Sequence, residues 1–184
     1  MKKNILITIL AIILIVIVIF IYKGSKQTDY FNQIQLNTTN TIINDSVVPK
    51  YTDTVISVGL SSLELNNLFI QIKPIIPATV DKFNTDNQGL ALQAYVVQAG
   101  EDVYIIYMSQ LSKLETIKVL SHELIHIKQY VDKKIVIKDE KNILWENKTF
   151  VNLDDVSYND RPWEIEAFNN QTDLNYKLNQ ILYK

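Results

Sequence analysis

Residues 112–131 have the sequence SKLETIKVLSHELIHIKQYV, which carries the strongest structural signals in the chain. Ser112 and Glu115 form a capping box, in which each side chain bonds a backbone N–H group that the start of a helix leaves unpaired. The apolar residues that follow recur at helical spacing: Ile117, Leu120, Leu124, Ile127 and Val131. The pattern predicts a long amphipathic helix that packs one apolar stripe against a core.

The face opposite that stripe carries the only two histidines of the chain, His122 and His126. Their spacing places both imidazoles one turn apart on one side of a helix, within reach of a single metal ion. Glu123 lies about 100° around the helix from His122, beside such an ion and not aimed at it. A carboxylate there suits a general base that takes a proton from an attacking water.

These residues form an H-E-x-x-H motif, and with it the chain resembles the zincin metallopeptidases. The resemblance implies a Zn²⁺ cofactor and a peptide or protein substrate. Zinc needs a third protein ligand. Because the chain has no cysteine and no further histidine, that ligand must be an Asp, a Glu or a Tyr.

Residues 161–168, RPWEIEAF, resemble the helix on which a glutamate completes the zinc site in the gluzincin branch. The Pro-x-Glu-x-Glu-Ala segment within them is similar to one in small bacterial and phage-encoded metallopeptidases. The resemblance favours Glu166 as third ligand, with Asn170 as a hydrogen-bonding support for a zinc histidine. Glu164 is the alternative, because helical angles place both glutamates equally far from the helix's apolar stripe. Asp132 is a weaker alternative.

The same resemblance implies the remaining parts of a catalytic site. Tyr158 and Arg161, just before the glutamate-bearing helix, are candidate donors to the oxyanion of the transition state. The strand predicted at 103–107 is the candidate edge with which a substrate pairs, and a buried middle strand is the equal alternative. The rival hypothesis is a non-catalytic, membrane-anchored binding module with a structural zinc site.

Periodicity elsewhere predicts further helices and strands, and the resemblance then implies an α+β zincin-like domain with an antiparallel sheet, an active-site helix and a C-terminal glutamate-bearing helix. A helix is expected from Ser61 to Pro74, and a hairpin of strands at 90–98 and 103–107. Short strands are expected at 135–137, 143–145 and 149–151. Pro162 is expected to open the final helix, since proline is favoured in a first turn.

The N-terminal part of the chain is strongly apolar. Residues 5–22 are almost unbroken Ile, Leu, Val and Phe, enough to cross the hydrocarbon layer of a bilayer. They follow a short flank (1–4) and precede a polar linker (23–45) and the predicted domain (46–184). We therefore expect a single-pass protein of the cell membrane, anchored in the lipid bilayer, with an extracytoplasmic domain. A cleaved signal peptide is the alternative.

Composition excludes several other classes of protein. The formal net charge of −2 removes the electrostatic basis for binding nucleic acid. The absence of cysteine excludes disulfides, thiolate metal sites and a cysteine nucleophile. The oligomeric state is left open by the sequence.

Overall fold

The computed structural model describes residues 39–45, 48–75 and 92–183. Their main sheet has the order β1-β2-β4-β3. Its strands are β1 (Thr41–Asn44), β2 (Phe69–Pro74), β3 (Ala94–Gln98) and β4 (Val103–Met108). The α+β class is confirmed, but the sheet is mixed: β1, β2 and β4 run parallel, and only the β3–β4 hairpin is antiparallel. The expectation of an antiparallel sheet was wrong for β1 and β2, because a helix connects them as a parallel crossover.

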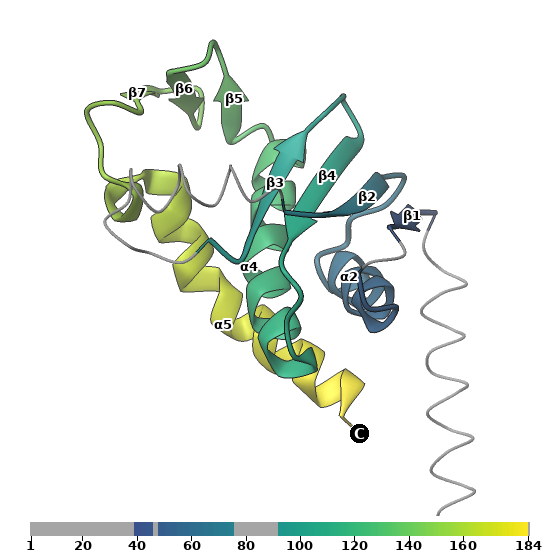
Figure 1. The fold of residues 1–184 in the computed structure, drawn as a ribbon. Coiled ribbons are helices and arrows are strands. Elements are labelled where there is room, and N and C mark those ends of the chain that lie inside the picture. The colour runs from purple at the N-terminus through teal and green to yellow at the C-terminus, as the bar shows by residue number, and fades with distance from the viewer. Residues whose placement is uncertain (1–38, 46–47, 76–91, 184) are drawn as a thin grey trace, which may run out of the picture. The chain divides into compact units, whose positions relative to one another are not determined.

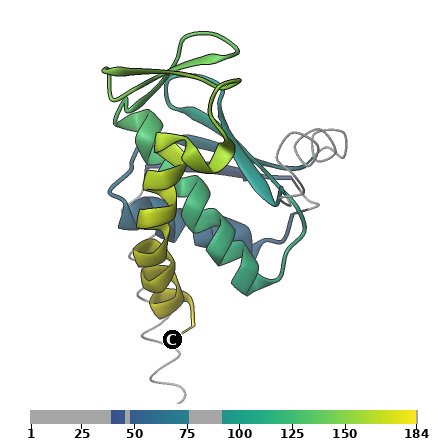
Figure 2. The same ribbon diagram turned by 90° about the vertical axis from the view of Figure 1, so that its left-hand side faces the viewer.

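Three long helices gather on one side of this sheet in the described part of the chain (Figures 1 and 2). They are α2 (Tyr51–Ser62), α4 (Lys113–Val131) and α5 (Pro162–Leu182). Helices α2 and α4 contact the sheet, and α5 packs on those two helices. At Gly59 of α2, an added Cβ would lie 2.3 Å from Cδ1 of Leu124, so the absence of a side chain there permits close packing of α2 on α4.

The capped helix predicted from residue 112 is confirmed as α4. Ser112 accepts a hydrogen bond from the Glu115 amide, and the Glu115 carboxylate accepts one from the Ser112 amide at 3.0 Å. The first four residues of its predicted stripe are fully buried in the core, while Val131 is exposed. The capping box therefore sets the start of the helix that carries both histidines.

The helix predicted from Ser61 to Pro74 was wrong, because α2 ends at Ser62 and residues 69–74 form β2. The spacing of Leu65, Leu68, Phe69 and Ile72 fits a helix, yet Ile70 and Ile72 also alternate with period two and are both buried. Positive φ angles at Glu64 and Asn67 break any helical path between the two elements.

The remaining predicted elements are confirmed, except that the strand predicted at 90–98 begins at Ala94 and its first two residues lie outside the described residues. A second, antiparallel sheet contains β5 (Ile135–Ile137), β6 (Asn142–Trp145) and β7 (Thr149–Asn152). A short 3-10 helix, η1 (Tyr158–Asp160), precedes α5, and Pro162 stands in the first turn of α5. Ile135 and Val151 of this small sheet pack against Trp163 of α5, so they fix the end of the helix that carries Glu164.

The N-terminal predictions fall mostly beyond these residues. Residues 41–44 of the predicted linker form β1 and pair with β2. The predicted membrane segment, 5–22, lies outside the described residues. Among the helices that are described, none combines the length and the apolar character that a membrane span requires.

Candidate metal centre

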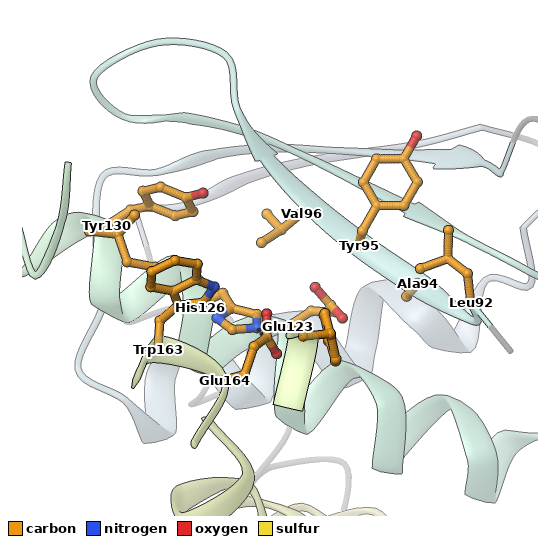
Figure 3. Close-up of a pocket in the computed structure, with 11 residues that line it drawn as sticks. Leu92, Ala94, Tyr95, Val96, Glu123, His126, Tyr130, Trp163 and Glu164 are labelled. Carbon is orange, nitrogen blue, oxygen red and sulfur yellow. Dashed lines mark ion pairs between the residues drawn. The ribbon is translucent and has the colours of Figure 1, made fainter. Parts of the chain in front are cut away.

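Two helices bring three buried ligating side chains together. His122 and His126 extend from α4, with their Nε2 atoms 3.0 Å apart. Glu164, from the first turn of α5, places Oε2 at 3.1 Å from Nε2 of His122 and 3.4 Å from Nε2 of His126. These side chains form a group able to hold a metal ion (Figure 3 shows His126 and Glu164 facing each other). The three residues are 5–8% exposed.

The spacing of these atoms fits a small tetrahedral ion. Ligand bonds of about 2.0–2.1 Å at tetrahedral angles separate two donor atoms by about 3.3 Å. The observed separations of 3.0 to 3.4 Å lie around that value. Two nitrogens and one oxygen form one of the donor sets of catalytic zinc sites, which leave a fourth position open.

A glutamine supports each histidine on its other nitrogen. Nδ1 of His126 lies 2.8 Å from Oε1 of Gln129, and Nδ1 of His122 lies 3.2 Å from Oε1 of Gln171. Gln129 also donates to the carbonyl of Trp163 at 3.0 Å, which ties α4 to the residue before Glu164. An amide oxygen can only accept, so each Nδ1 carries a proton and each Nε2 faces the centre, where it can donate to Glu164 when protonated or bind a metal ion through its lone pair when neutral.

Sequence reasoning missed both glutamines. Gln129 follows His126 by three residues on the same helix, which is a detectable signal for a neighbouring pair. Gln171 lies on another helix from His122, and no spacing within the sequence links the two.

The carboxylate of Glu164 and the imidazole of His126 stabilise each other's charged forms. Burial by itself would raise the pKa of Glu164, but hydrogen bonds from His122 and His126 outweigh it and lower this pKa to about 2. Burial would likewise lower the pKa of His126, but the hydrogen bond and charge of Glu164 outweigh it and raise this pKa to about 9. The centre therefore favours a positive charge between its ligating atoms, whether protons or a metal ion supply it.

The structure brings Glu164 to the histidines and not Glu166, so the expected preference for Glu166 is corrected. The Glu166 carboxylate lies 2.7 Å from Nζ of Lys134, which follows α4 and stands opposite this side of α5. Asn170 donates to the backbone carbonyl of Glu166 in its own helix and does not reach a histidine. Asp132 caps the end of α4 and pairs with Lys128 at 2.9 Å.

Glu123 lies beside the three ligating residues without joining them. It is 6% exposed and accepts a hydrogen bond from the backbone N–H of Val96 in β3. Burial raises the pKa of its carboxyl, and the neighbouring histidines act in the opposite direction. A raised pKa brings a carboxylate closer to the range in which it exchanges protons at neutral pH.

Glu123 lines two cavities. The first, here called the aromatic cavity, has a volume of about 310 Å³ (Figure 3). The second, here called the lysine cavity, has a volume of about 270 Å³. The aromatic cavity is lined by Tyr130, Ile135 and Trp163, besides His126 and Glu164. The lysine cavity is lined by Gln93, Lys118, Val119, Asn159, Phe168 and Gln171, besides His122.

The two predicted oxyanion donors lie in different surroundings. Tyr158 lines both cavities and bonds Glu164, while burial raises the pKa of its hydroxyl. The guanidinium carbon of Arg161 lies 5.5 Å from the centre of the Tyr158 ring. Arg161 lines neither the aromatic nor the lysine cavity. Tyr158 therefore lines the space that a substrate could enter, and Arg161 contacts Tyr158 without lining that space.

The strand at 103–107 is not a sheet edge, so the alternative of a buried middle strand is confirmed. Strand β4 lies between β2 and β3, so its backbone is paired on both sides, and β3 is an edge strand of the sheet that the described residues form. Hydrogen bonds that join Gln93 to Ser109 and Ala99 to Val103 set the pairing of β3 with β4. Because paired residues alternate along an antiparallel strand, Ala94 and Val96 direct their backbone groups away from β4 and toward the site.

No family model matches this chain, and no curated protein or solved structure matches it either.

Proposed function

We propose that the chain is a membrane-anchored, zinc-dependent peptidase of the H-E-x-x-H type, with His122, His126 and Glu164 as ligands and Glu123 as general base. The observation that carries the proposal is the convergence of three buried ligating side chains with a second carboxylate, that of Glu123, beside them. A site with a purely structural role has no use for that second carboxylate, which belongs to a residue that lines both cavities.

A bound zinc ion would lower the pKa of a water molecule and polarise the carbonyl to be attacked. Glu123 would take the proton of the attacking water and then give it to the leaving amine. Its hydrogen bond from Val96 holds the carboxylate between the metal centre and the edge strand. The Tyr158 hydroxyl, which lines both cavities, is the donor that we assign to the developing oxyanion.

The edge strand β3 supplies a place for an extended peptide. The outward backbone groups of Ala94 and Val96 would pair with the substrate as an added strand. Such a strand would run past Glu123, because both Ala94 and Glu123 line the two cavities. Backbone pairing would bind peptides with little dependence on sequence, and the cavities would select side chains.

The anchor is a separate part of the proposal. Residues 5–22 would hold the peptidase domain at the membrane, with the domain on the extracytoplasmic side. Protease accessibility in intact cells tests this orientation, and carbonate extraction separates an integral membrane protein from one released after signal cleavage. Digestion of the domain only after the cells are opened would contradict the orientation.

The catalytic proposal is tested by measuring zinc content and peptide hydrolysis on the full chain in detergent, for the wild type and for Glu123→Gln. We expect about one zinc per chain in both proteins. Because Gln has the same shape but cannot accept the proton, hydrolysis by the variant should fall by about 10²–10⁴-fold.

Two outcomes would contradict the proposal. Equal hydrolysis by both proteins at matched zinc content would remove Glu123 from the reaction. Stoichiometric zinc without hydrolysis of a broad peptide library would favour the structural zinc module instead.

A further inference from the structure

The two cavities beside Glu123 differ in charge. The aromatic cavity contains the Glu164 carboxylate together with apolar and aromatic side chains. The lysine cavity is lined by one residue with an ammonium group, Lys118, and by three residues with amide side chains. Glu123 is the only carboxylate that lines the lysine cavity in the described part of the chain. One side of the site is therefore suited to apolar groups and the other to an anion.

Lys118 has a free positive charge in the described part of the chain. It is exposed, and no carboxylate of the described residues lies within ion-pair distance of it, whereas Lys128, Lys134 and Lys141 each have such a partner. Lys118 precedes His122 by four residues, which places the two side chains one turn apart on the same face of α4. Its ammonium group can thus meet a ligand that also reaches the metal centre.

The neighbours of Lys118 add hydrogen-bond donors and an apolar wall. Gln171 uses its Oε1 atom on His122, which leaves its NH₂ group to donate to a ligand. The ring of Phe168 lies 4.7 Å from that of His122 and is partly open to solvent. An occupant with a short apolar stem and a terminal carboxylate matches both features, because the stem packs on Phe168 and the carboxylate meets the donors.

The position of the lysine cavity along β3 relates it to the direction of a bound peptide. Gln93, which immediately precedes β3, lines the lysine cavity, whereas Tyr95 and Val96 line the aromatic cavity. A peptide that pairs antiparallel with β3 has its C-terminal part near the beginning of that strand. The lysine cavity would then receive the residue that follows the cleaved bond.

We propose that the lysine cavity is a carboxylate-binding subsite, so that the enzyme prefers substrates with a carboxylate on the residue after the cleaved bond. This inference rests on the proposed peptidase function. The carboxylate could belong to an Asp or Glu side chain or to the C-terminus of the substrate, and the same contacts would bind either.

The first test measures binding without hydrolysis. The full chain in detergent is dialysed free of metal and titrated with two pairs of probes by saturation-transfer NMR. The first pair is N-acetylglutamic acid α-amide and its glutamine counterpart, and the second is N-acetylleucine and its amide. The first pair tests a side-chain carboxylate and the second a terminal one. We expect at least one carboxylate probe to bind about 5-fold more tightly than its neutral counterpart at low salt. Lys118→Gln should remove this difference.

Lys128→Gln is the matched control, because Lys128 is a lysine of the same helix that already pairs with Asp132. The preference should remain in this variant and should decrease as salt is added. No preference in the wild type, or an unchanged preference in Lys118→Gln, would overturn the proposal.

The second test maps cleavage sites by mass spectrometry in a peptide library, with free or amidated C-termini. If the subsite binds a side-chain carboxylate, the wild type should show about 5-fold enrichment of Asp and Glu at the position after the cleaved bond. If it binds a terminal carboxylate, the wild type should remove the last residue of peptides with a free C-terminus and leave amidated peptides intact. Lys118→Gln should show neither, and Lys118→Glu should enrich Lys and Arg. Carboxylate binding without cleavage would retain the subsite and reject the peptidase. Cleavage with no carboxylate preference would retain the peptidase and reject the subsite.

Discussion

The two sides of α5 at its N-terminal end face different parts of the molecule. On one side, the Glu164 side chain is 7% exposed and lies against the imidazoles of His122 and His126. On the other side, two residues further along, the Glu166 side chain is 26% exposed and pairs with Lys134. Both are carboxylates at the start of one helix, and only their neighbours distinguish them.

The difference shows that the role of a carboxylate on α5 is decided by the residues that face it from the neighbouring element. A buried carboxylate is retained only where partners replace the water that it loses, and such a group becomes a candidate ligand. A partly exposed carboxylate beside a lysine forms a surface ion pair, which contributes little. The assignment of the third ligand therefore depends on the rotation of α5 relative to α4.

The largest expected effect concerns zinc binding. Glu164→Gln should lower zinc affinity by more than the roughly 100-fold that the loss of a supporting residue can cost, because it removes a ligand itself. Glu166→Gln, on the other side of the helix, should change zinc affinity by less than about 3-fold. Competition with a chromophoric chelator measures both affinities. A reversed result would move the metal centre to Glu166.

The pH dependence of the metal-free protein distinguishes the same two sides. The pKa of His126 is raised from 6.5 to about 9 in the folded protein. This interaction stabilises the fold fully below pH 6.5, and its contribution is lost as the pH rises through 9. The free energy of unfolding should therefore fall by about 3 kcal/mol between pH 6 and pH 10.

Urea unfolding followed by tryptophan fluorescence checks this loss, since Trp163 adjoins Glu164. Glu166→Gln should retain the loss of stability, while Glu164→Gln should reduce it. Saturating zinc should also reduce it, because a bound ion replaces the protons. A pH-independent stability for the metal-free wild type would contradict the geometry of the centre.

Loss of Gln129, which supports His126 on the buried side of α5, should change zinc affinity less than loss of the ligand Glu164. Gln129→Ala removes the acceptor for Nδ1 of His126 and should lower zinc affinity by about 10–100-fold. Asn170→Ala is the control, because its side chain bonds only the backbone of its own helix among the described residues. Isothermal titration calorimetry compares the two variants, and equal affinities would exclude a role for Gln129.

The smallest effect is expected at the surface ion pair. Lys134→Met removes the partner of Glu166 while keeping an apolar stem, and should destabilise the fold by at most about 1 kcal/mol. Zinc affinity should not change. Thermal unfolding at low and high salt measures the difference, which salt should reduce. A loss of several kcal/mol would show that this side of α5 is more tightly coupled to the core than its exposure indicates.

The predicted fold succeeded where the signal is local and failed where it is not. The Ser112 capping box, the β3–β4 hairpin and Pro162 each act within a few residues of the element they define. The stretch from Leu65 to Ile72 fits both a helical and a strand period, so its environment selected the strand. Strand order is non-local as well, since β4 becomes an interior strand only when β2 pairs with it.

The H-E-x-x-H motif by itself predicted that His122, Glu123 and His126 lie together, because helical periodicity places residues three and four apart on one face. The tertiary structure alone decided that Glu164 joins them, that Gln129 and Gln171 support the histidines, and that β3 is the edge. These outcomes depend on the rotation and position of α5 relative to α4 and on which strands pair. Many apolar contacts far apart in the sequence set that geometry together, and no short segment encodes their sum.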